Sequence, residues 1–110
     1  MPRFLAILNG SAGDIDRVGL TEQQQADFMA AWSAWARAHR TALIDPGAPL
    51  FRKRRVTADG VEEFEDAKVA YAVVEADSHD DAVRILGEHP HLTLFRGNSI
   101  EVIECPAVLG

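Results

Sequence analysis

Residues 69–105 read VAYAVVEADSHDDAVRILGEHPHLTLFRGNSIEVIEC, and this stretch decides the fold of the chain. The apolar residues of Val69–Ala76 alternate and predict a strand, and Ser78 then offers an N-cap for a helix that Gly87 ends. After a loop, Ser99–Cys105 alternates again and predicts another strand. The stretch is therefore a strand–helix–strand unit.

The predicted strand at residues 69–76 is apolar on both of its faces. One face carries Val69, Tyr71 and Val73, and the other carries alanines and Val74. Helices on one side of the sheet would leave the other apolar face in water. We therefore expect a second copy of the chain to cover that face, in a homodimer that packs sheet to sheet.

The residues before this unit predict a strand, a helix and a hairpin. Phe4–Leu8 alternates as a strand, and Thr21 caps a helix that the segment Asp45–Pro49 stops. Leu50–Thr57 is expected to be the second strand of the sheet. The Asp-Gly pair at residues 59–60 is a strong hairpin signal directly after it.

The complete order of elements is strand, helix, strand, strand, helix, strand, or βαββαβ. Right-handed connections then give an α+β, ferredoxin-like fold, with four antiparallel strands and two helices on one face. The length of 110 residues fits a single domain over residues 1–110.

The composition argues against several classes of protein. The net charge of −6 opposes a nucleic-acid role, because phosphate binding needs a concentrated positive surface. No apolar run approaches the roughly 18 residues that span a bilayer, and the run near the N-terminus is too short for a signal peptide. We expect a cytoplasmic protein with no nucleic-acid or membrane partner, in which the single cysteine, Cys105, is a small buried hydrophobe.

The first helix carries a candidate catalytic residue. His39 lies on one helical stripe with Trp32 and Trp35, near the helix C-terminus, where the dipole favours its charged form. His39 is predicted either as a capping or core histidine or as a general acid/base beside a pocket. The two tryptophans are either core residues or the apolar walls of that pocket. Asp45 could orient His39, or it could form the turn before Pro46.

Three further residues are candidates for a site. Asp59 is a turn residue that could also serve as a proton acceptor. Arg54 belongs to the basic run at residues 52–55, which is either a solvated strand or a binding surface for an anionic ligand. His91 lies in the loop after a helix, where a pocket could open. His89 and His91 have the spacing H-x-H but no third ligand nearby, so we expect neither a metal ion nor a cofactor.

These elements, in this order, resemble the YCII-related family, and within it the branch described by an Asp-Gly-Pro-Phe (DGPF) motif. The matching pieces are the first strand RFLAIL, the helix FMAAWSAWARAHRTAL, the turn ADG, the block AYAVVEADSHDDAVRIL, and HPHL with the closing SIEVIECPAV. The resemblance implies a ferredoxin-like domain that dimerises as an α/β barrel in the bacterial cytoplasm. For some relatives it also implies a His–Asp pair in lyase-like or dehalogenating chemistry on small aromatic compounds.

Two departures from the family pattern bear on function. The hairpin reads DGVE at residues 59–62, without the Pro and Phe of the motif. Residues 26–30 hold no histidine, although the better-understood branch has its own in this region. The leading hypothesis is therefore a non-catalytic module, with a regulatory role as one use, that binds a small organic ligand or a protein. The alternative is a cofactor-free enzyme, lyase or dehydrochlorinase-like, that acts on a small organic substrate through His39 with Asp45 or Asp59.

Overall fold

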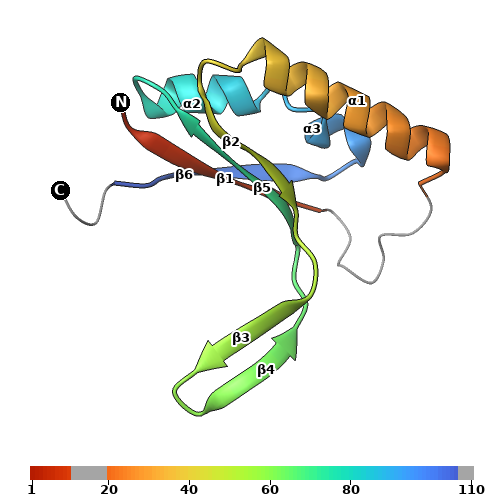
Figure 1. The fold of residues 1–110 in the computed structure, drawn as a ribbon, viewed down its shortest axis with the longest axis vertical. Coiled ribbons are helices and arrows are strands. Elements are labelled where there is room, and N and C mark those ends of the chain that lie inside the picture. The colour runs from red at the N-terminus through yellow and green to blue at the C-terminus, as the bar shows by residue number, and fades with distance from the viewer. Residues whose placement is uncertain (11–19, 107–110) are drawn as a thin grey trace.

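The structure, a computed structural model, describes residues 1–10 and 20–106 (Figure 1). The elements of this part of the chain are β1 (Arg3–Asn9), α1 (Glu22–Ala38), β2 (Leu43–Pro49), β3 (Lys53–Thr57), β4 (Gly60–Phe64), β5 (Lys68–Glu75), α2 (His79–Leu86), α3 (His91–Leu94) and β6 (Ser99–Glu104). The short helix α3 was not predicted, because its four residues lack a helical apolar stripe of their own.

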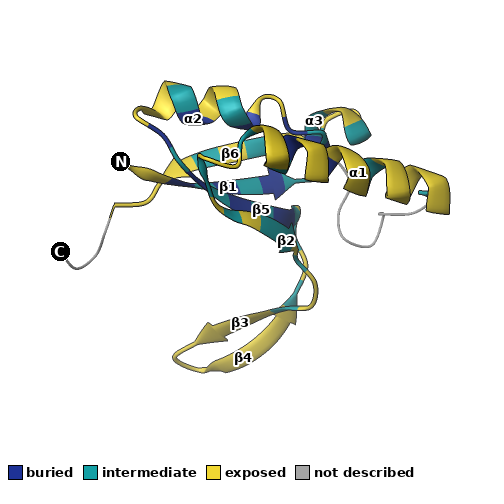
Figure 2. Cartoon of the chain, turned by 45° about the horizontal axis from the view of Figure 1, so that its top comes forward, coloured by how far each residue is buried: buried dark blue, intermediate teal, exposed yellow. Residues whose placement is uncertain are grey.

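The main sheet has four strands in the order β2-β5-β1-β6, and every neighbouring pair is antiparallel. The helices lie together on one face of this sheet, as Figures 1 and 2 show from two directions. This arrangement confirms the predicted ferredoxin-like α+β fold. We call the face without helices the open face.

The second strand of the main sheet is not where the sequence analysis placed it. It is β2 at Leu43–Pro49, whereas Leu50–Thr57 was expected, and α1 already ends at Ala38 instead of continuing to Asp45. The two prolines of β2 are tolerated because this strand lies at the edge of the sheet and pairs with β5 through irregular register.

Gly47 makes the irregular pairing of β2 possible. Its φ of +92° lies in the left-handed region, and a Cβ atom at this position would stand 1.6 Å from the carbonyl oxygen of Tyr71. Only glycine can therefore bring the β2 backbone this close to β5. A motif that indicates a turn in the sequence becomes a bulged strand in the sheet.

The strands β3 and β4 form a separate two-stranded hairpin, residues 53–64, which we call the arm. The arm projects from the body on the side away from the helices, and Figure 2 shows it almost entirely exposed. The chain enters the arm at Arg52, whose φ of 45° also lies in the left-handed region. The predicted hairpin turn at residues 59–60 is confirmed, but it joins β3 to β4 instead of two strands of the main sheet.

The predicted helix starts are confirmed by their caps. The Thr21 hydroxyl accepts a hydrogen bond from the Gln24 N–H at 3.1 Å, and the Gln24 side chain accepts one from the Thr21 N–H at 2.9 Å. At α2, the Ser78 hydroxyl accepts from the Asp81 N–H at 3.1 Å. Both starts depend on residues close together in sequence, which is why the sequence predicts them well.

The core lies between the sheet and the helices. Its buried members are Phe4, Ala6 and Leu8 of β1, Val69, Ala70, Ala72 and Val74 of β5, Ala76, Trp32 and Trp35 of α1, and Ala82 and Leu86 of α2. The alternate residues of β1 and β5 point to the open face and are only half-buried. The structure therefore encloses one side of the sheet and leaves the other side accessible.

Candidate functional site

Along the strands, the open face passes from the ion pair of Arg3 and Glu75 to apolar side chains and then to a polar end. The register places one side chain from each of β5, β1 and β6 in each cross-strand row. The successive rows are Val73, Leu5 and Ile103, then Tyr71, Ile7 and Glu101, then Lys68, Asn9 and Ser99. An apolar platform therefore adjoins a polar end, close to the base of the arm.

Tyr71 and Asp45 form a hydrogen-bonded pair on the open face. The Tyr71 hydroxyl donates to Asp45 Oδ2 at 2.8 Å, and the Gly47 N–H donates to Asp45 Oδ1, also at 2.8 Å. The hydrogen bond to Asp45, and next its negative charge, raise the pKa of the Tyr71 phenol. Both side chains are half-buried, so the pair is fixed in position and still reachable from solvent.

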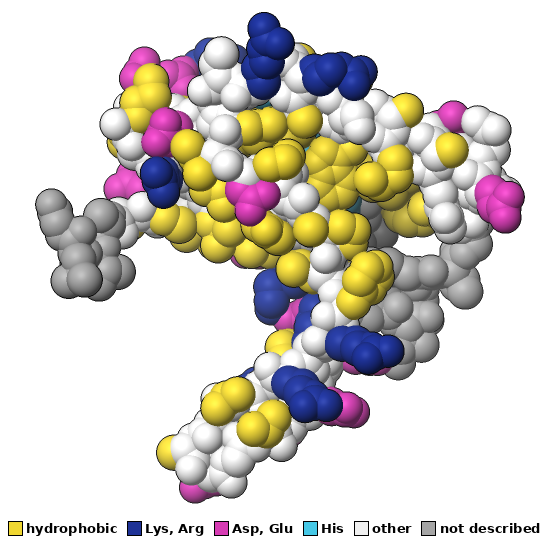
Figure 3. Space-filling model, viewed as in Figure 1, with side chains coloured by type: hydrophobic (Ala, Val, Ile, Leu, Met, Phe, Trp, Pro, Cys, Tyr) yellow, Lys and Arg dark blue, Asp and Glu magenta, His cyan; other side chains and the backbone are white. Residues whose placement is uncertain are grey.

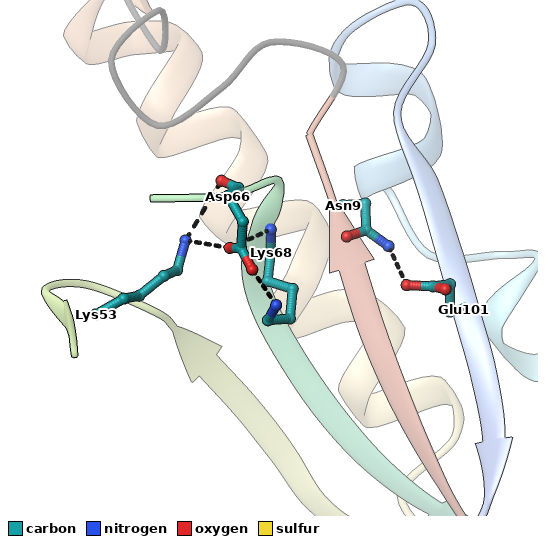
Figure 4. Close-up of polar contacts among 5 residues, drawn as sticks. All are labelled: Asn9, Lys53, Asp66, Lys68 and Glu101. Carbon is teal, nitrogen blue, oxygen red and sulfur yellow. Dashed lines mark hydrogen bonds and ion pairs between the residues drawn. The ribbon is translucent and has the colours of Figure 1, made fainter. Parts of the chain in front are cut away.

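Asp66 holds two lysines at the polar end of the open face (Figure 4). Its carboxylate accepts from Lys53 Nζ at 2.9 Å, from Lys68 Nζ, and from the Lys68 N–H at 3.1 Å. The side-chain hydrogen bond from Lys68 is the largest cause that lowers the pKa of Asp66 from 3.8 to about 2. Because Lys53 begins the arm and Lys68 begins β5, this cluster ties the arm to the sheet.

Asn9 and Glu101 complete the polar end. Asn9 Nδ2 donates to Glu101 Oε1 at 2.7 Å, and Figure 4 shows Asn9 on β1, between Lys68 on β5 and Glu101 on β6. The carbonyl oxygen of Asn9 also accepts from His91 Nε2 at 2.8 Å. The Asn9 backbone is therefore bound from the helix side of the sheet, while the Asn9 side chain lies on the open face.

The helix side of the sheet holds four residues that the sequence predicted for a site. Trp32 Nε1 donates to the Pro46 carbonyl oxygen at 3.1 Å, and Trp35 Nε1 donates to the Ile85 carbonyl oxygen at 2.9 Å. His91 is 3% exposed. His39 caps α1, and its Nε2 lies 2.6 Å from Glu88 Oε2 at the surface. Among the described residues, His39 is hydrogen-bonded to Glu88 and Asp45 to Tyr71. The proposed pair of His39 and Asp45 is therefore divided between two separate contacts.

His89 stands between the two tryptophans in this layer. Its ring centroid lies 4.9 Å from that of Trp32 and 4.6 Å from that of Trp35. The cluster is thus a packed aromatic contact around a histidine that is 2% exposed. Within the described ranges, no group of three His, Cys, Asp or Glu side chains is arranged to hold a metal ion, and no helix is long and apolar enough to cross a membrane.

The remaining predicted residues lie on the arm. Asp59 is exposed at the turn, where its N–H donates to the Thr57 hydroxyl at 3.2 Å. Arg54 is exposed on β3 and lines a groove of about 860 Å³ at the base of the arm. The groove is lined by Leu50, Phe51, Arg52, Lys53, Arg54, Glu63, Phe64 and Glu65. Cys105, expected to be buried, is exposed because it follows the end of β6.

The predicted residues are therefore divided among the helix layer, the open face and the arm. Asp45 is the one that lies on the open face. Sequence reasoning missed its hydrogen-bond partner Tyr71 and the whole polar end, which comprises Lys53, Asp66, Lys68, Asn9 and Glu101. Period-two spacing along β1 and β6 was a usable signal, but a bulge beside Lys68 breaks this spacing on β5, and only the register shows that these positions lie side by side.

Comparisons with known proteins support the fold. No protein-family model matches the chain, and no curated protein sequence does. Among solved structures, the chain is similar to 5-chloro-2-hydroxyhydroquinone dehydrochlorinase (TftG) from Burkholderia phenoliruptrix, in complex with 2,5-dihydroxybenzoquinone. The TM-score is 0.51 at 17% identity, and the match covers 92% of this chain and 91% of the other. At this identity the likeness establishes a shared fold.

Proposed function

We propose that this protein binds a small, oxygenated, planar organic molecule on the open face of its sheet. The observation that carries the proposal is the Tyr71–Asp45 pair, which is fixed at the border between the apolar row and the polar end. Leu5 and Val73 offer an apolar platform for a ring. The Tyr71 oxygen can accept a hydrogen bond from a ligand hydroxyl, because its own proton is donated to Asp45.

The polar end suits a ligand with a negative or strongly polar group. The Lys68 side chain is 45% exposed, so its ammonium is accessible to such a group. Dihydroxybenzoquinone, the molecule bound in the similar dehydrochlorinase, is a flat oxygenated ring of this kind. That resemblance in fold supports the choice of ligand class for this chain.

A homodimer that packs sheet to sheet is part of the proposal. A chain of 12.0 kDa folded as a compact monomer exposes roughly 6000 Å², whereas this chain exposes 7560 Å². The excess, roughly 1600 Å² for one chain, is about twice the roughly 800 Å² that each partner of a standard-size interface buries, so it leaves room for such an interface beside the exposed arm. Ile103 on the open face is 46% exposed, which a second copy would cover while it closes the ligand site.

Binding without chemistry is the primary proposal, and an acid–base enzyme is the second. The Tyr71–Asp45 hydrogen bond favours the second, because it links a phenol that faces the ligand to a carboxylate that could take a proton. Of the three residues predicted for catalysis, His39 pairs with Glu88 and Asp59 lies at the tip of the arm. Asp45 is therefore the catalytic candidate that this proposal keeps.

Titration of 2,5-dihydroxybenzoquinone, followed by calorimetry and by amide NMR shifts, tests the site. We expect the Tyr71→Phe variant to bind roughly 5- to 15-fold more weakly, because one hydrogen bond to the ligand is lost. Val73→Asp should abolish binding by placing a charge on the platform. Thr41→Val removes an exposed hydroxyl away from the site and is the matched control. Unchanged affinity in both open-face variants, or shifts confined to the helix layer, would refute this site.

Chromatography of mixtures of the protein with 2,5-dihydroxybenzoquinone and with a chlorinated hydroquinone separates the two candidate functions. A module that only binds returns the quinone unchanged, whereas an enzyme converts a chlorinated hydroquinone and slows in Asp45→Asn. Loss of turnover in His39→Gln with normal turnover in Asp45→Asn would assign the chemistry to the helix side instead.

A further inference from the structure

The two faces of the arm differ in how many of their side chains form ion pairs or other contacts within the chain. On the first face, Arg55 pairs with Glu62 at 2.6 Å, and its guanidinium lies 4.4 Å from the centre of the Phe64 ring. Lys53 on the same face reaches Asp66. This face is closed by contacts within the chain.

The second face is open to solvent, and we call it the docking face: Arg54, Val56, Val61 and Glu63. The register pairs Arg54 with Glu63 and Val56 with Val61 across the two strands. Val56 is 77% exposed and Val61 is 62% exposed. The side chains of Arg54 and Glu63 are exposed, and neither forms an ion pair or a hydrogen bond within the described part of the chain. Figure 3 shows hydrophobic side chains on the arm next to cationic ones.

The docking face continues at the base of the arm into the groove of about 860 Å³. Arg54 and Glu63 belong to both surfaces, and the groove adds the ring of Phe51, which is 75% exposed. An isolated two-stranded hairpin is only marginally stable in water. Exposed valines on such a hairpin therefore call for a partner surface that stabilises it.

We propose that the docking face of the arm packs against the docking face of a second copy of this chain. The face carries one positive and one negative side chain next to each other, so it is its own electrostatic complement. A two-fold axis along the arm places Arg54 of each copy opposite Glu63 of the other and stacks valine pair on valine pair. Nucleic acid does not fit, because the face has no net positive charge.

Pairing through faces also avoids the repulsion that pairing through strand edges would bring. An edge contact between two β3 strands would align the basic run at residues 52–55 with itself, and one between two β4 strands would align Glu62 and Glu63 with theirs. In the face-to-face contact, each positive Arg54 instead lies opposite a negative Glu63 of the other copy. This inference goes beyond the proposed function, because it concerns the arm and does not require a ligand on the open face.

Charge reversal with complementation tests the arm contact by sedimentation velocity at micromolar concentrations. In Arg54→Glu and Glu63→Arg alone, two attractive contacts become repulsive, so we expect association at least roughly tenfold weaker than in the wild type. A 1:1 mixture of the two variants should associate as a heterodimer, identified by a mass tag on one of them. The double variant should associate like the wild type. Arg96→Glu is the matched control, and circular dichroism checks that every variant is folded.

The outcomes separate the arm contact from the other proposals. Single variants that associate like the wild type, or a mixture that fails to associate, overturn the arm contact, because a purely intramolecular role cannot be rescued by another chain. Association that survives Arg54→Glu but is lost in Val73→Asp assigns the dimer to the open face alone. A wild-type chain that sediments only as a monomer refutes both contacts, while the quinone titration still tests the ligand site.

Discussion

Protonation of His89 should destabilise the fold in mild acid. His89 is 2% exposed between two tryptophan rings, and its Nδ1 accepts from the His91 N–H at 3.0 Å. Among residues 1–10 and 20–106, its Nε2 has no hydrogen-bond partner. Burial, and to a lesser extent the charge of His91, lower the pKa of His89 from 6.5 to about 4. A proton on Nδ1 would also break the hydrogen bond from His91. The folded state therefore requires the neutral ring.

The sign and size of the effect follow from this shift. The unfolded chain takes up a proton near pH 6.5 and the folded chain only near pH 4, so the unfolded state binds more protons between these values. The free energy of unfolding is unaffected above about pH 7 and falls as the pH drops through 6.5. Below pH 4 it has lost the whole contribution of the neutral His89, which we call the His89 share. That share is about 3 kcal/mol, of which about 2 kcal/mol is lost between pH 7 and 4.5.

Urea unfolding of the wild type and of His89→Phe, followed by circular dichroism between pH 7 and 4.5, measures this share. Phenylalanine keeps a ring between the tryptophans, so we expect stability within about 1 kcal/mol of the wild type at pH 7 and a smaller loss in acid. His39→Gln, which removes a histidine outside the aromatic cluster, is the control and should keep the acid loss. Equal losses in the wild type and in His89→Phe would refute the reasoning.

Two further substitutions test how β2 and the arm are attached to the sheet. Gly47→Ala should lower the free energy of unfolding in urea by about 2 to 4 kcal/mol, because the new Cβ would collide with the Tyr71 carbonyl oxygen at a positive φ. Gly60→Ala is the control, because a Cβ there meets no atom within 4 Å. Equal losses in both variants would contradict the steric argument. Asp66→Asn should cost about 1 kcal/mol, because a carboxylate that is 28% exposed loses its charge pairing with Lys53 and Lys68. The pKa of Asp66 is lowered to about 2, so in the wild type this contribution is present above pH 3.8 and is lost as the pH falls from 3.8 to 2. Faster hydrogen exchange in the arm of Asp66→Asn is the expected result, and unchanged exchange there would argue against the tether.

The local sequence determined most of the secondary structure. The strand predicted at Phe4–Leu8 is β1 at Arg3–Asn9, and the one predicted at Ser99–Cys105 is β6 at Ser99–Glu104. Both helices start at the predicted caps. Alternation and capping involve residues a few positions apart, so their physical causes are present in any short window of the chain.

The second strand and the site depended on contacts between distant residues. The segment Leu43–Pro49 contains two prolines and a glycine, and it becomes a strand only because β5 offers an edge on which a bulge is tolerated. The displaced residues 53–57 then form the arm. For the same reason, the sequence left Asp45 either to orient His39 or to form the turn before Pro46, whereas the register brings it to Tyr71.

The sequence by itself thus determined the strands β1, β5 and β6, the two helix caps and the apolar character of both faces of β5. Only the tertiary structure decided which side chains share a row of the open face, where the arm projects, and that His89 is enclosed by Trp32 and Trp35. The physical reason is the range of the interactions. Caps and alternation act within one or two turns of the chain, whereas register and burial depend on pairing between strands that lie tens of residues apart.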